Sequence, residues 1–170
     1  MGLEGHAAAM YWTHLAALLP AGTGFNGRVT RDAVDPVNQA INYVYGMLYG
    51  EVWRALVKAG MDPYFGIMHG SERDQGSLVF DLIEEFRAPF ADRLVVAMIG
   101  RGLKLDTAAD GGLRSRSRRM LAHSFIRAWT RAIRWRGKDL APATILERQA
   151  GALAKLIAGD ADYHPFRMRW

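Results

Sequence analysis

The segment from Asp35 to Gly60 places the strongest constraint on the fold, because its apolar residues form one stripe at helical spacing. They recur every three or four positions, as on one face of an α-helix; they are Val37, Ile41, Val44, Leu48, Val52 and Leu56. Asp35 and Pro36 supply a capping acid and a proline at the first helical position, and Gly60 ends the pattern. The stripe therefore predicts a core-facing helix from Asp35 to Ala59.

The same periodicity predicts helices almost throughout the remaining chain. We expect helices from Glu4 to Leu19, from Ser77 to Ile99 with a kink at Pro89, across the basic segment that follows a loop at Asp110 to Gly112, and from Pro142 to Ala158. No pair of strands stands out. The sequence thus predicts an all-α fold, with about five main helices in a single domain spanning residues 1–170.

Composition excludes several classes of protein. The 170 residues, half of them hydrophobic, suffice for one domain with a substantial core. The absence of cysteine excludes disulfides and thiol-based metal or redox chemistry, and it favours a reducing compartment. No signal-like segment and no run of about 20 apolar residues is present. We therefore expect a cytoplasmic protein with no membrane partner.

Positive charge is concentrated in one segment of a chain whose net charge is +5. Nine Lys or Arg residues and no acid lie between Gly111 and Lys138. The run LRSRSRR contributes four arginines, which are Arg114, Arg116, Arg118 and Arg119. Three more follow at four- and three-residue spacing, and these are Arg127, Arg131 and Arg134. With apolar residues such as Leu121 and Phe125 on the other face, this pattern predicts one basic stripe along a helix. A DNA phosphate backbone is the natural partner, while a merely solvated face and an anionic lipid surface are the alternatives.

Candidate metal ligands lie at two places in the chain. Glu84 lies fifteen positions after His69, Asp81 lies three residues before Glu84 in a helical pattern, and Glu4 opens the first helix. One nitrogen and two carboxylate ligands would balance a divalent cation, and this mixed donor set points to Mg²⁺ or Mn²⁺. The alternative is that His69 is an ordinary loop histidine and that the acids complement a helix dipole.

Four strings carry a resemblance to a known family. LEGHAAAMYW, DPVNQAINYVYGMLYGEVWRALVKAGMDPYFGIMHG, SLVFDLIEEFR and PFRMRW occur in this order over nearly the whole chain. They resemble the catalytic domain of the CRISPR adaptation integrase. The combination of a glutamate before a small-residue helix, a histidine after GMDPYFGIM and the acids of DLIEE makes the resemblance specific.

The resemblance implies a helical, metal-dependent integrase and endonuclease that inserts short foreign DNA into a CRISPR repeat array. Its metal ligands fall on Glu4, His69 and Glu84, and Asp81 falls on a neighbouring acid that supports the site. The implied partners are double-stranded DNA with free 3′ ends and CRISPR repeat DNA. Arg87 would contact a phosphate, or pair with Glu84 or Asp81 in the absence of metal.

The implied family also places Asn38 and Tyr45 near the active site, although Tyr45 could equally pack in the core with its hydroxyl satisfied. A β-rich N-terminal domain usually precedes the catalytic lobe, so the sequence resembles either a fragment or a compact member. A compact form would assemble as a dimer or tetramer through its helical lobe, with or without the family's small bridging protein. A DNA-binding scaffold with an incomplete metal site is the alternative function.

Overall fold

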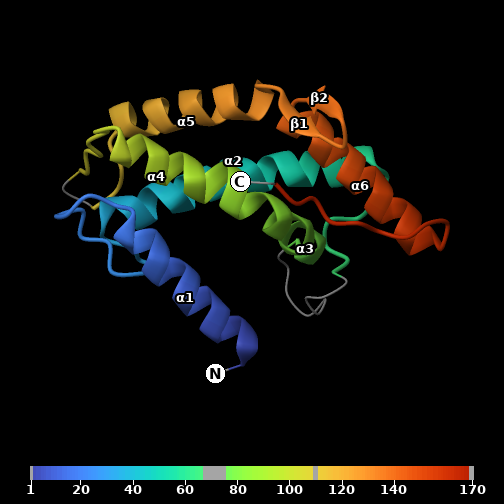
Figure 1. The fold of residues 1–170 in the computed structure, drawn as a ribbon, viewed down its shortest axis with the longest axis horizontal. Coiled ribbons are helices and arrows are strands. Elements are labelled where there is room, and N and C mark those ends of the chain that lie inside the picture. The colour runs from blue at the N-terminus through green and yellow to red at the C-terminus, as the bar shows by residue number, and fades with distance from the viewer. Residues whose placement is uncertain (1, 67–75, 109–110, 169–170) are drawn as a thin grey trace.

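The computed structural model describes residues 2–66, 76–108 and 111–168 of the chain. Helices make up most of these ranges, and a small antiparallel hairpin joins two of them (Figure 1). The elements are α1 (Leu3–Ala17), α2 (Pro36–Lys58), α3 (Ser77–Phe86), the π-helical turn η1 (Arg87–Asp92), α4 (Arg93–Gly100), α5 (Ser115–Thr130), β1 (Ile133–Trp135), β2 (Lys138–Leu140) and α6 (Pro142–Ala158). The all-α prediction is confirmed.

Helix α2 forms the centre of the packing, and α3, η1, α5 and α6 all contact it. Its predicted stripe is buried, with Ile41, Val44, Leu48 and Val52 fully removed from solvent. The predicted start is also present, because the Asp35 side chain accepts a hydrogen bond of 2.8 Å from the Asn38 backbone N–H. Helix α1 is different: it projects away from the other helices, and the residues from Gly5 to Met10 are exposed (Figure 1).

The long helix expected from Ser77 to Ile99 is interrupted where Pro89 lies. Proline has no backbone N–H and its ring displaces the carbonyl of the preceding turn. The chain accommodates it with the single π-helical turn η1, between α3 and α4. This turn carries Asp92 at its end, where the residue is buried against α2. The interruption predicted at Pro89 therefore takes the form of a π-helical turn.

The basic helix ends earlier than predicted. Helix α5 stops at Thr130, Arg131 has an extended backbone as the C-cap, and Arg134 lies in strand β1. Strand β1 pairs with β2, Ile133 facing Leu140 and Trp135 facing Lys138. A two-residue turn at Arg136 and Gly137, both with positive φ, joins them. The prediction of no strand pair and of one continuous helical stripe through Arg134 was therefore wrong.

Candidate metal and nucleic-acid site

The structure describes the predicted metal ligands to different extents. Glu84 and Asp81 lie on α3, and Glu4 lies in the first turn of α1, where only the backbone is described. His69 lies outside the described residues. Asp81 is buried at 8% exposure, whereas the Glu84 side chain is 51% exposed. The two carboxylates expected on one helix face therefore sit at different depths, and Glu84 is the one accessible to a ligand.

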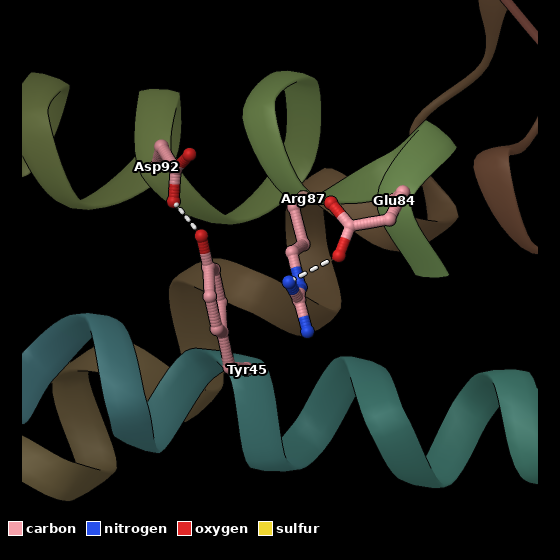
Figure 2. A network of polar contacts seen from close by, with 4 residues as sticks. All are labelled: Tyr45, Glu84, Arg87 and Asp92. Carbon is pink, nitrogen blue, oxygen red and sulfur yellow. Dashed lines mark hydrogen bonds and ion pairs between the residues drawn. The ribbon is translucent and has the colours of Figure 1, made fainter. Parts of the chain in front are cut away.

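Glu84 forms an ion pair with Arg87, one turn along the helix (Figure 2). The Arg87 guanidinium also lies over the ring of Tyr45, 5.0 Å from its centroid, so the aromatic face helps to hold the cation. Its Nε is buried and has no hydrogen-bond partner. The expected pairing of Arg87 with Glu84 is thus present. Within the described residues, no cluster of three or more potential metal ligands occurs.

Asp92 is a buried polar residue that the sequence reasoning missed. Both of its carboxylate oxygens accept hydrogen bonds of 2.7 Å, Oδ2 from the Tyr11 hydroxyl of α1 and Oδ1 from the Tyr45 hydroxyl of α2 (Figure 2 shows the second). Burial raises the pKa of the Asp92 carboxyl, while the two tyrosines, Arg28 and Arg87 partly oppose that rise. The one available signal was an acid inside the apolar run FADRLVV.

The two tyrosines are held as hydrogen-bond donors. Burial, and then the negative charge of Asp92, raises the pKa of both Tyr11 and Tyr45. Tyr45 is therefore a partly buried residue with its hydroxyl satisfied, as one of its two sequence interpretations expected. Through Asp92, the α3–η1 segment that carries Glu84 is connected to both α1 and α2.

Asn38 has a structural role in this region. Its side chain is fully buried, donates 2.8 Å to the Gly27 carbonyl and accepts 3.0 Å from the Val29 backbone N–H. These bonds fix the loop that carries Arg28, whose guanidinium lies 5.1 Å from the centroid of the Tyr45 ring. Together with Arg87, two arginines from distant segments therefore contact one tyrosine ring.

Glu85, next to Glu84, anchors the C-terminal segment instead of facing solvent. It accepts hydrogen bonds from the Tyr163 hydroxyl, from the Phe166 backbone N–H at 2.6 Å and from Gln149 at 3.0 Å. The Phe166 ring stacks on Phe86, with centroids 5.1 Å apart. The consecutive glutamates of DLIEE thus divide into an exposed carboxylate and a structural one.

Apart from Arg87, which is partly buried, the predicted DNA-binding arginines are exposed and form two groups. One group surrounds the start of α5 and contains Arg114, Arg116, Arg118 and Arg119. The other contains Arg127 in the last turn of α5, and Arg131 and Arg134 after its end. Leu121, Phe125 and Trp129 anchor the helix by its buried face. Three arginines of the first group line an open cavity of about 1240 Å³ together with Asn42 and Gln39; they are Arg114, Arg116 and Arg118. In the second group, Arg134 forms an ion pair of 3.4 Å with Asp139, so the net positive charge of this group is reduced.

None of the described helices is long and apolar enough to cross a membrane. This agrees with the absence of an apolar run of spanning length in the sequence.

Comparisons with known proteins agree with this architecture. The fold is a helical lobe also present in a casposase bound to integration product, with a TM-score of 0.84 at 23% identity over 94% of this chain and 47% of that chain. It is also similar to a chain of a Cas6-RT-Cas1–Cas2 complex, with a TM-score of 0.78 at 25% identity over 93% of this chain and 18% of that chain.

Sequence comparison identifies the family. Residues 1–131 match the family described as CRISPR associated protein Cas1. The chain is 36% identical over 176 residues to a CRISPR-associated endonuclease Cas1 of Thermus thermophilus, which covers 99% of this chain and 53% of the relative. The chain belongs to the Cas1 family. It spans about half the length of the curated relatives it matches.

Proposed function

We propose that this chain is a DNA integrase and endonuclease that inserts short foreign DNA into a CRISPR repeat array. Membership of the Cas1 family supports the class of reaction. The observation that carries the proposal is the exposed Glu84 carboxylate, held by the neighbouring Arg87. An acid in this state can exchange its guanidinium partner for a metal ion, and the released guanidinium can bind a phosphate.

Glu4, His69 and Glu84 would hold Mg²⁺ or Mn²⁺ in this proposal, and Asp81 would support the site from its buried position. One imidazole nitrogen and two carboxylates fit such a cation and leave positions for substrate oxygens. When bound, the cation would polarise the scissile phosphate and neutralise charge on the departing oxygen.

The proposed reaction is a transesterification without a covalent enzyme intermediate. The 3′-oxygen of the incoming DNA forms a bond to phosphorus in the target strand and loses its proton to solvent. The bond from that phosphorus to the target's own 3′-oxygen breaks, and the departing oxygen takes up a proton. Arg87, once separated from Glu84, would hold a non-bridging phosphate oxygen. Water in place of the incoming hydroxyl would give endonuclease cleavage.

The basic groups at the two ends of α5 would bind the DNA backbone. The first group has the stronger case, because three of its arginines line one cavity. Phosphate contacts of this kind position DNA without reading its sequence. We further propose that double-stranded DNA with free 3′ ends and CRISPR repeat DNA are the substrates. The active assembly would be a dimer or tetramer of this chain, with a small CRISPR adaptation protein as a bridging partner.

An integration assay tests the proposal directly. Labelled short duplexes with free 3′-hydroxyls are incubated with a supercoiled plasmid that carries a repeat array, in Mn²⁺ or Mg²⁺, with His69→Ala as the control. Label joined covalently to plasmid by the unmodified chain alone supports the proposal. Salt-sensitive DNA binding without joining would instead identify this chain as a scaffold whose metal site is incomplete.

A further inference from the structure

The hydrogen bonds of Asp92 connect the helix of one proposed metal ligand to the segment that carries another. Tyr11 of α1 donates to Oδ2 at 2.7 Å, and Tyr45 of α2 donates to Oδ1 at 2.7 Å. Asp92 itself closes η1, which continues directly from the α3 helix of Glu84. One carboxylate is therefore a common reference point for α1, α2 and α3.

Among the residues that the structure describes, few pack against the N-terminal half of helix α1. Although most of its residues are apolar, it projects from the other helices, and its residues from Gly5 to Met10 are exposed (Figure 1). Its packing against the body occurs further along, where Leu15 is buried and Trp12 lies against Phe25. Tyr11 adds a directional contact at this junction, and a hydrogen bond constrains rotation about the helix axis more than apolar packing does.

The spacing along α1 relates this contact to Glu4. Tyr11 follows Glu4 by seven residues, which is about two helical turns, so the two positions share one face of the helix. On the other side, Glu84 pairs with Arg87, and the Arg87 guanidinium lies over the ring of the same Tyr45 that donates to Asp92. Contacts from Asp92 thus extend to the residues beside Glu84 and to the face of α1 that contains the Glu4 position.

We propose that Asp92 is a positioning residue, which sets the rotation and distance of α1 relative to α3 so that Glu4 and Glu84 can bind the same divalent cation. This inference rests on the proposed metal-dependent function. The energetic cost of the residue supports it, because a carboxylate only 2% exposed is expensive to bury and an apolar side chain would fill the space more cheaply. Two hydroxyl donors in fixed directions constrain the relative orientation of the helices, which an apolar contact does not.

The test compares two variants of α1 that each lose one hydroxyl. Tyr11→Phe removes the bond to Asp92, while Thr13→Val removes a bond that stays within α1, from the Thr13 hydroxyl to the Ala9 carbonyl. The chain has no cysteine, so spin labels can be placed at Ala8→Cys and Ala158→Cys, both exposed, without background labelling. Double electron–electron resonance spectroscopy then measures the distribution of distances between the two spin labels, from α1 to α6. Isothermal titration calorimetry measures the Mn²⁺ affinity.

We expect Tyr11→Phe to broaden the distance distribution and to weaken Mn²⁺ binding about tenfold, the effect of losing a hydrogen bond to a charged group. Asp92→Asn should act in the same direction, and Thr13→Val should match the unmodified chain in both measurements. Retention of Mn²⁺ affinity by both Tyr11→Phe and Asp92→Asn would overturn the inference. Weaker Mn²⁺ binding with an unchanged distance distribution would also overturn it, because the effect would then be electrostatic. Absence of Mn²⁺ binding by the unmodified chain would instead reject the proposed function on which the inference rests.

Discussion

The Arg87 guanidinium lies 5.0 Å from the centroid of the Tyr45 ring, so its position is set by an aromatic face on a different helix. The same guanidinium pairs with Glu84. Arg87 is therefore held where it can neutralise the proposed metal ligand until a cation replaces it, and this competition can be measured.

Replacement of Arg87 by Met should raise the affinity of the DNA-free protein for Mn²⁺ by about two- to fivefold, the range expected for loss of a solvent-accessible ion pair. The apolar stem is largely preserved, so the change removes mainly charge. Arg54→Met is the matched control, because Arg54 forms the same kind of pair with Glu51 three residues earlier on α2. Titration calorimetry provides the measurement, and equal affinities in all three proteins would show that Arg87 does not compete with metal.

Replacement of Glu84 by Gln should abolish strand transfer, with a loss of at least about a hundredfold, while fold and DNA affinity are retained. The change removes an anionic ligand at nearly constant shape, and the side chain is half exposed, so little packing is lost. Joining of labelled duplex to plasmid is measured, with Glu51→Gln as the control for loss of a Glu–Arg pair. Transfer at the unmodified rate would remove Glu84 from the site.

Removal of the arginines at the start of α5 should weaken DNA binding and reduce its salt dependence. Log affinity falls with log salt, and each phosphate that the protein no longer neutralises reduces the magnitude of this negative slope by about 0.9. The triple replacement of Arg114, Arg116 and Arg118 by Ala should therefore reduce its magnitude more than replacement of Arg134 alone, which already pairs with Asp139. Lys155→Ala on α6 serves as a single-charge control. Similar losses for all DNA sequences are expected, and an unchanged slope in the triple variant would place the DNA elsewhere.

The features that could be predicted from sequence are those that depend on the spacing of residues close together in the chain. The period of Val37 to Leu56 predicted α2, Asp35 and Pro36 predicted its start, and the three-residue separation of Glu84 and Arg87 allowed their pairing. Asp92 and Tyr11 are 81 residues apart, and no local sequence pattern predicts a hydrogen bond between residues so distant in the chain.

The hairpin after α5 was missed for a different reason. Arg136 adopts positive φ in its turn, a conformation more usual for Gly, Asn or Asp, so the sequence lacked the ordinary signal of a two-residue hairpin. The arginines at 127, 131 and 134 also imitate helical spacing across the true helix end at Thr130. The apolar residues Phe125, Trp129 and Ile133 keep helical spacing across the same point, so neither periodicity marked the end of this helix.

Asp92 should make the stability of the protein depend on pH in the direction opposite to most acids. Its folded pKa is raised above the ordinary 3.8, so the native state binds more protons than the unfolded state between these two values. Stability from this group is thus fully present below about pH 3.8 and falls as pH rises through the folded pKa, by about 1.4 kcal/mol for each unit of the difference. Asp92→Asn lacks this titration. The unfolding free energy of the variant relative to the unmodified chain should therefore increase as pH rises, and a constant difference from pH 4 to 7 would show that Asp92 has an ordinary pKa.

Gly76 should tolerate no side chain, because it allows α3 to begin close to α2. A Cβ at this position would lie 2.7 Å from the Tyr49 hydroxyl oxygen and 2.9 Å from a ring carbon of Trp53, and both aromatic rings are packed. Gly76→Ala should therefore destabilise the fold by about 1–3 kcal/mol, as overpacking does, and displace the start of the helix that carries Glu84. Gly46 is the matched control within α2, where an added Cβ meets nothing within 4 Å. Gly46→Ala should raise the unfolding free energy by about 0.5–1 kcal/mol, because alanine favours a helix interior. Chemical denaturation measures both effects, and equal stabilities in the two variants would show that the close approach at Gly76 does not constrain α3.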